Sequence, residues 1–155
     1  MPVLKWIRKK RQGHSGLASV LLDVEREGRP GNSMTEWEAP LEALDLAHLI
    51  VNKLEEHQAS NIVVLELTEI TSFTDYFVIC TAESDRQART LKEILADELK
   101  QDFATRPLST EGEPASGWLL LDYNTVIVHI FSSQGRAFYR LEEFWKAAPV
   151  VLKIQ

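Results

Sequence analysis

The sequence predicts an α/β (α+β) fold in which helices pack on a mixed sheet of mainly five strands. Three observations support this class. Segments with helical periodicity alternate with short β-branched runs, in the order α-β-β-α-β-β-β-α. Of the 155 residues, 45% are hydrophobic and 26% are charged, which is the balance of an ordinary globular domain with a packed core. No apolar run approaches the roughly 20 residues that span a bilayer, so we expect no membrane helix.

The first half of the pattern is a helix followed by two strands. An amphipathic helix is expected over residues 41–58, where apolar side chains recur on one helical stripe. Two short apolar runs, over residues 61–67 and 73–81, are typical of strands because they are rich in β-branched and aromatic residues. The link between them is too short for a crossover helix, so we expect the two strands to pair antiparallel.

A second helix should begin after Ser84 and end near residue 102. Ser84 and Gln87 have the spacing of a capping box, in which Ser84 caps the Gln87 amide and the Gln87 side chain reaches back. Asp85 also suits the positive end of the helix dipole.

The last third of the chain should hold three strands and one helix. A short strand is expected near residues 106–109, and the runs 118–122 and 126–131 are close enough to form a hairpin. Along the second of these strands, even-numbered and odd-numbered residues should face opposite sides of the sheet. A last helix is expected over residues 134–145, with an apolar stripe made of Phe138, Leu141, Phe144 and Trp145.

Charge divides the chain into two parts. Residues 1–34 carry seven Lys and Arg against three acids, whereas residues 35–155 carry ten against twenty. A body with that excess of acids repels phosphate, so we expect no direct nucleic-acid binding by the globular domain. It should instead be attracted to a basic protein surface.

Three segments are expected: a basic, disordered extension over residues 1–40, a globular domain over 41–146 and a C-terminal tail over 147–155. Two alternatives stay open for the extension, a tether to an anionic surface and a true start at Met34. The single cysteine, Cys80, lies in an apolar run and cannot form an internal disulfide, which indicates a reducing, cytoplasmic setting.

The sequence offers little that resembles an active site. It has no glycine-rich phosphate loop, and its four histidines do not have metal-ligand spacing, so no cofactor or metal is expected. His129 lies within a strand, where a packed histidine is expected more than a catalytic base. Asp75 opens a strand as a Mg²⁺ ligand of a nucleotidyltransferase does, and Asp122 is the candidate second carboxylate. We therefore predict a protein that is not an enzyme and keep nucleotidyl transfer as the lesser alternative.

Trp118 opens a strand after a polar loop, and Asp122 and Tyr123 close the same strand. A tryptophan beside a loop and flanked by acids is typical of an interface anchor when it is exposed. Packing at the edge of the core is the equally weighted alternative.

Three blocks of the sequence resemble the signature blocks of the Iojap/RsfS family of ribosome silencing factors. In chain order they read SFTDYFVICTAESDRQ, EGEPASGWLLLDYNTVIVHIF and RAFYRLEEFW. The resemblance covers residues 41–146, whereas residues 1–40 depart from it because most members begin near the first helix.

The resemblance implies a nucleotidyltransferase-like core without catalytic residues. It also implies binding to ribosomal protein L14 at the intersubunit face of the large ribosomal subunit, which blocks joining of the small subunit and represses translation. Organellar members of the family act in assembly of the large subunit, and members often form homodimers.

From this resemblance and the acidic body we expect a partner-binding face built from strand ends. Trp118 would be its anchor, and acidic side chains would meet Lys and Arg of the ribosomal partner. The residues predicted to bind the partner are Trp118, Asp122, Tyr123, Asp75, Tyr76, Glu111 and Arg86.

Overall fold

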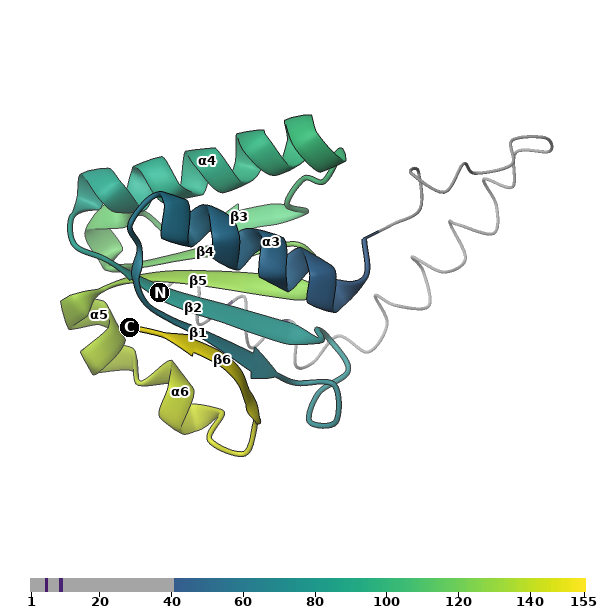
Figure 1. The fold of residues 1–155 in the computed structure, drawn as a ribbon. Coiled ribbons are helices and arrows are strands. Elements are labelled where there is room, and N and C mark those ends of the chain that lie inside the picture. Colours follow the sequence, from purple (N-terminus) through teal and green to yellow (C-terminus); the bar gives the residue numbers. More distant parts are fainter. Residues whose placement is uncertain (1–4, 6–8, 10–40) are drawn as a thin grey trace, which may run out of the picture.

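The computed structural model describes Lys5, Lys9 and residues 41–155 (Figure 1). The extension predicted over residues 1–40 therefore lies outside the described residues, apart from those two lysines. In chain order the elements of the body are α3 (Ala43–Glu56), β1 (Ser60–Glu66), β2 (Tyr76–Ala82), α4 (Asp85–Phe103), β3 (Ser109–Glu111), the 3₁₀ turn η2 (Pro114–Ser116), β4 (Trp118–Asp122), β5 (Val126–Ser132), α5 (Ser133–Tyr139), α6 (Leu141–Phe144) and β6 (Val150–Ile154).

The described strands form one six-stranded sheet in the spatial order β3-β4-β5-β2-β1-β6. Neighbouring strands are antiparallel except β2 and β5, which run parallel. A parallel pair needs a long crossover connection, and the segment from α4 to β4 supplies it. The predicted mixed sheet with packed helices is confirmed, as are the antiparallel pairing of β1 with β2 and the hairpin of β4 with β5.

The sheet has one strand more than the five that the sequence predicted. Residues 147–155, expected to be a tail, contain β6, in which Leu152 lies opposite Val64 of β1. Without β6, the outer edge of β1 would leave its backbone N–H and C=O groups without strand partners. The tail prediction is therefore wrong for Val150–Ile154, because this segment completes the sheet.

The helix predicted over residues 134–145 is two short helices. α5 ends at Tyr139, the next residue Arg140 has a left-handed φ of 47°, and α6 begins directly after it. A residue in this conformation ends an α-helix and turns the chain, so one continuous apolar stripe does not form. The short strand expected near residues 106–109 lies slightly later, at Ser109–Glu111.

α4 begins as the capping pattern predicts. The Gln87 backbone N–H donates to Ser84 Oγ across 3.1 Å. The Gln87 side chain reaches back one residue further than expected, since its Oε1 accepts from the Glu83 amide at 2.7 Å. None of the helices in the described part of the chain has the length and apolarity needed to cross a membrane.

The two faces of the sheet are covered differently. α3 and α4 cover one face, and α5 and α6 lie against the other (Figure 1). The predicted alternation along β5 is confirmed, because Val126, Val128 and Ile130 belong to the cluster under α3 and α4, whereas Ile127 and Phe131 belong to the cluster on the α5 side. The face under α5 and α6 carries most of the aromatic side chains of the described residues.

Candidate functional site

The sheet face beneath α5 carries an aromatic cluster centred on Trp118. The ring centroid of Trp118 lies 4.7 Å from that of Tyr139 on α5 and 4.9 Å from that of Phe131 on β5. Its Nε1 donates a hydrogen bond of 3.1 Å to Nδ1 of His129. Trp118 is only 2% exposed, so its ring is packed and its indole N–H is hydrogen-bonded inside the protein.

His129 is fully buried in this cluster, and burial lowers the pKa of its imidazole to about 3. The ring is therefore neutral at physiological pH. Because Nδ1 accepts from Trp118, the proton lies on Nε2, which has no hydrogen-bond partner among the described residues. The Phe77 ring lies edge to face with the imidazole, with centroids 4.5 Å apart. His129 is thus a packed core histidine, which is what the sequence favoured over a catalytic base.

α5 begins at a close approach between two glycines. Ser132 Oγ caps the helix by accepting from the Gly135 amide at 3.0 Å. A Cβ atom on Gly135 would lie 2.2 Å from the carbonyl oxygen of Gly117, which is far inside van der Waals contact. The Gly117 carbonyl in turn accepts from the Ser132 amide at 3.0 Å. These contacts place α5 directly against the loop that precedes Trp118.

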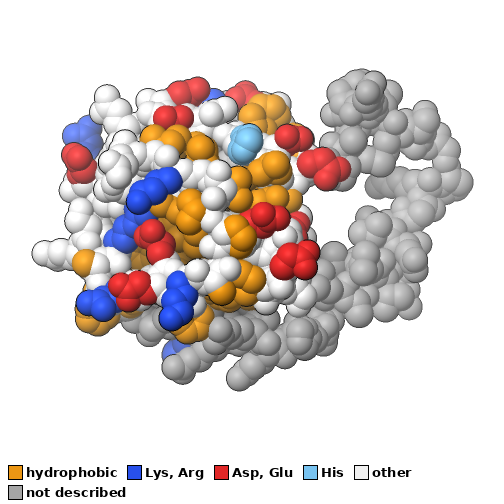
Figure 2. All heavy atoms as spheres, turned by 60° about the horizontal axis from the view of Figure 1, so that its bottom comes forward, with side chains coloured by type: hydrophobic (Ala, Val, Ile, Leu, Met, Phe, Trp, Pro, Cys, Tyr) orange, Lys and Arg blue, Asp and Glu red, His pale blue; other side chains and the backbone are white. Residues whose placement is uncertain are grey.

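Large apolar side chains are exposed on the outer side of α5 and α6. Phe138 is 76% exposed, Phe144 59% and Val150 58%. Val150 lies opposite Leu65, a member of the buried cluster on this side of the sheet, so it belongs to the same side of the molecule. Figure 2 brings the α5 and α6 side of the molecule forward and shows hydrophobic side chains gathered between basic and acidic ones. We call Phe138, Phe144 and Val150 the α5–α6 face.

Sequence reasoning assigned Phe138 and Phe144 to a buried helical stripe, and this assignment is wrong. Leu141 and Trp145 are buried, but Phe138, which precedes the turn at Arg140, and Phe144, at the end of α6, are exposed. The missed signal was the break between α5 and α6, which the regular apolar spacing concealed.

Three of the predicted partner-binding residues are buried and do not share a face. Trp118, Asp122 and Tyr123 are 2%, 2% and 6% exposed, so none is the exposed anchor that was expected. Tyr123 belongs to the cluster under α3 and α4, where its OH donates to the Leu95 carbonyl at 3.1 Å and burial raises its pKa. Asp122 Oδ1 accepts from the Asn124 amide at 2.7 Å, which stabilises the turn between β4 and β5.

The other four predicted residues lie nearer the surface but not together. Asp75 and Tyr76 are half-buried at the start of β2, where both amides donate to the Thr125 carbonyl. Burial, followed by the charges of Glu66 and Asp75, raises the pKa of Tyr76. Glu111 is half-buried on β3, and Arg86 is exposed in the first turn of α4. The seven residues therefore do not form one continuous patch.

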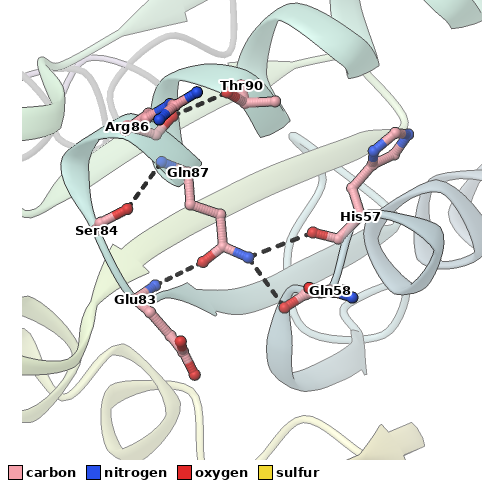
Figure 3. Close-up of a pocket in the computed structure, with 7 residues that line it drawn as sticks. All are labelled: His57, Gln58, Glu83, Ser84, Arg86, Gln87 and Thr90. Carbon is pink, nitrogen blue, oxygen red and sulfur yellow. Dashed lines mark hydrogen bonds between the residues drawn. The ribbon is translucent and has the colours of Figure 1, made fainter.

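Arg86 borders an open hollow between the turn after α3 and the start of α4 (Figure 3). The side-chain amide of Gln87 spans this hollow, donating to the carbonyls of Gln58 at 3.0 Å and His57 at 3.3 Å. Its oxygen is already bonded to Glu83. The polar groups of Gln87 therefore join α3 to α4 and are not left over for a ligand.

Within the described residues, one group of side chains has the proximity of metal ligands: Glu56, His57 and Glu98. The ammonium group of Lys53 lies 2.7 Å from Glu98 and 3.6 Å from Glu56. This cation neutralises the carboxylates and ties α3 to α4. The arrangement is an ion-pair network, and it does not favour a metal site.

Comparison with known proteins agrees with the sequence blocks. The family described as "Ribosomal silencing factor during starvation" matches residues 40–155. A protein of Zymomonas mobilis named ribosomal silencing factor RsfS is 39% identical over 64% of this chain and 74% of its own. A mouse protein named for mitochondrial assembly of the ribosomal large subunit is 28% identical over 63% of this chain and 43% of its own.

Among solved structures, a crystal structure from Bacillus halodurans superposes with a TM-score of 0.61 and 30% identity, covering 70% of this chain and 98% of that one. The family match includes β6 as well as the aromatic cluster, α5 and α6. The chain belongs to the RsfS family of ribosomal silencing factors.

Proposed function

We propose that this chain is a cytoplasmic ribosome silencing factor that binds ribosomal protein L14 at the intersubunit face of the large ribosomal subunit. By occupying that face it blocks joining of the small subunit and represses translation, with no bond made or broken. Membership of the family and the names of its relatives support this proposal. The charge of residues 35–155, ten basic against twenty acidic groups, also suits a basic ribosomal protein.

The observation that carries the proposal is the α5–α6 face. Phe138 and Phe144 expose apolar surface to water. Exposed apolar patches commonly mark protein interfaces. On this side of the molecule, basic and acidic side chains lie around hydrophobic ones, as at the rim of an interface (Figure 2). We therefore place the contact with the large subunit on α5 and α6.

The residues predicted from sequence take two roles in this proposal. Trp118 supports the face from beneath through its ring contact with Tyr139, and Asp122 and Tyr123 hold the end of β4 in place. Asp75, Tyr76, Glu111 and Arg86 are the surface members of the set, and we propose that they contact the partner at its margin.

The experiment compares sedimentation of purified large subunits with three forms of the chain: wild type, Phe138→Ser with Phe144→Ser, and Leu108→Ser. Leu108 is a matched control because it is 70% exposed but precedes β3, away from α5 and α6. Each buried anchor of an interface is worth roughly 2 kcal/mol, so the double variant should bind at least about tenfold more weakly.

Small subunits are then added to score joining. Wild type and Leu108→Ser should co-sediment and reduce joining, whereas the double variant should do neither. If folded wild type does not co-sediment, the ribosomal proposal fails. If the double variant binds as wild type does, the contact lies elsewhere on the body.

Assembly of the large subunit is the second candidate function, favoured by the name of the mouse relative. Depletion in the source cell separates the two. If the chain is an assembly factor, its depletion should leave incomplete large subunits under all growth conditions. If it is a silencing factor, its depletion should leave complete large subunits and change only the fraction of them joined to small subunits during nutrient limitation.

We also propose that the chain forms homodimers through β6. This strand ends the sheet, and its outer edge is paired with no strand in the described part of the chain. Val150 and Val151 are 58% and 41% exposed, and such an edge readily pairs with another strand. Val151→Lys should abolish the dimer in sedimentation velocity, because a lysine on an edge strand opposes pairing. A monomeric wild type at high concentration would refute the dimer.

A further inference from the structure

Arg136 on α5 joins three other elements through its guanidinium group. Its Nε donates to Glu142 Oε1 on α6 at 2.7 Å, and its Nη1 donates to Thr81 Oγ1 on β2 at 2.9 Å. Nη1 also donates to the carbonyl oxygen of Asn61 on β1 at 2.5 Å. The side chain is 17% exposed, so most of it is turned away from solvent.

The Asn61 carbonyl is available because β1 contains an irregularity at this point. Pairing with β2 shifts between Ser60 and Val63, and Asn61 has a φ of 49°. A bulge of this kind takes one residue out of the ladder and leaves its backbone groups to find other partners. Arg136 supplies a charged donor to that carbonyl, which makes a strong hydrogen bond.

α5 and α6 depend on such contacts. They have 7 and 4 residues, and helices this short are not stable alone. Arg140 turns the chain between them, and the bond from Arg136 to Glu142 spans that turn. Phe138 follows Arg136 by two residues, and Phe144 follows Glu142 by two. The guanidinium therefore fixes the parts of α5 and α6 that carry the two exposed phenylalanines.

We infer that Arg136 is a positioning residue for the ribosomal contact: it holds Phe138 and Phe144 in the arrangement that the partner binds and does not itself meet the partner. This inference rests on the proposed function. Without Arg136, α5 and α6 sample other arrangements, and only a fraction of the molecules present a binding-competent face. The apparent affinity falls by that fraction.

The test compares Arg136→Gln with Arg89→Gln, using the full chain and purified large subunits. Arg89 is the matched control because it is an exposed arginine on α4, outside the α5–α6 face. Arg136→Gln should bind about tenfold more weakly if a tenth of the molecules remain competent. Arg89→Gln should stay near wild type, and Arg136→Lys should recover part of the loss, since lysine keeps the charge without the fork.

Two measurements separate positioning from general damage. Hydrogen exchange of Arg136→Gln should accelerate over residues 133–145 and stay unchanged in α4, showing that the fold persists. In a Phe144→Ser background, Arg136→Gln should cost clearly less affinity than in wild type, because the face it organises is already impaired. Equal losses in both backgrounds would mean that Arg136 acts independently of this face, and the inference would be overturned.

The possible failures are distinguishable. If wild type does not bind large subunits, the proposed function fails and the role of Arg136 in that contact fails with it. If wild type binds and Arg136→Gln binds equally well, the positioning role alone is refuted.

Discussion

The indole Nε1 of Trp118 and Nδ1 of His129 lie 3.1 Å apart on adjacent strands of the sheet. The two residues are not directly opposite each other, since His129 pairs with Leu120 and Trp118 pairs with Phe131. The indole therefore reaches diagonally across the ladder, a distance that only a long side chain spans. This bond fixes the imidazole tautomer and ties the start of β4 to the centre of β5.

Trp118→Phe should destabilise the protein by about 1–3 kcal/mol, because it keeps much of the packing but leaves the buried His129 Nδ1 without a donor. Trp118→Ala should cost more, roughly 3–5 kcal/mol, since it also opens a cavity. Urea unfolding of both variants and wild type measures the differences. Unchanged midpoints for Trp118→Phe would contradict a stabilising role for the hydrogen bond.

Burial of His129 predicts a loss of stability in mild acid. Its pKa is about 3 in the folded chain and about 6.5 when unfolded, so between these values the unfolded chain binds more protons. The stability from the neutral ring is fully present above pH 6.5 and falls by roughly 1 kcal/mol per pH unit below it. Unfolding at pH 7 and 5 for wild type and His129→Leu measures this. Parallel pH profiles would exclude His129 as the source.

The sequence predicted the sheet and the main helices because their signals are local. The capping pair Ser84 and Gln87 and the alternation along β5 each reflect contacts within a few residues. β6 was missed for the opposite reason. Its partner is β1, about ninety residues earlier, and nothing in residues 147–155 alone reports an open edge.

The candidate site was harder to predict, because exposure is a tertiary property. Trp118 has the setting of an interface anchor, but α5 folds over it and Tyr139 covers its ring. Phe138 fits a buried helical stripe until Arg140 breaks the helix. Strand parity did contain one usable signal: Trp118 and Tyr123 are an odd number of residues apart, which favours opposite faces.

Gly135→Ala should displace α5. A Cβ at this position would lie 2.2 Å from the Gly117 carbonyl oxygen, a backbone atom that cannot move aside as the end of a flexible side chain can. We expect destabilisation of about 1–3 kcal/mol, the usual cost of overpacking. Gln134→Ala on the same helix is the control, since Gln134 is exposed. Thermal unfolding compares the two variants, and equal melting temperatures would show that α5 shifts without cost.

Neutralising the surface acids should slow association more than it speeds dissociation. Asp75 and Glu111 are half-buried near the ends of their strands, and charges at the margin of an interface act mainly by steering the encounter. Asp75→Asn with Glu111→Gln should therefore lower the association rate with large subunits and flatten its dependence on salt, since steering is screened within about 10 Å at 0.1 M ionic strength. Glu93→Gln, exposed on α4, is the matched control. The test is to measure association and dissociation rates at several salt concentrations. If the association rate of the double variant depends on salt as steeply as that of wild type, Asp75 and Glu111 lie outside the contact. If dissociation is faster and association is unchanged, the two acids lie in the desolvated centre of the contact.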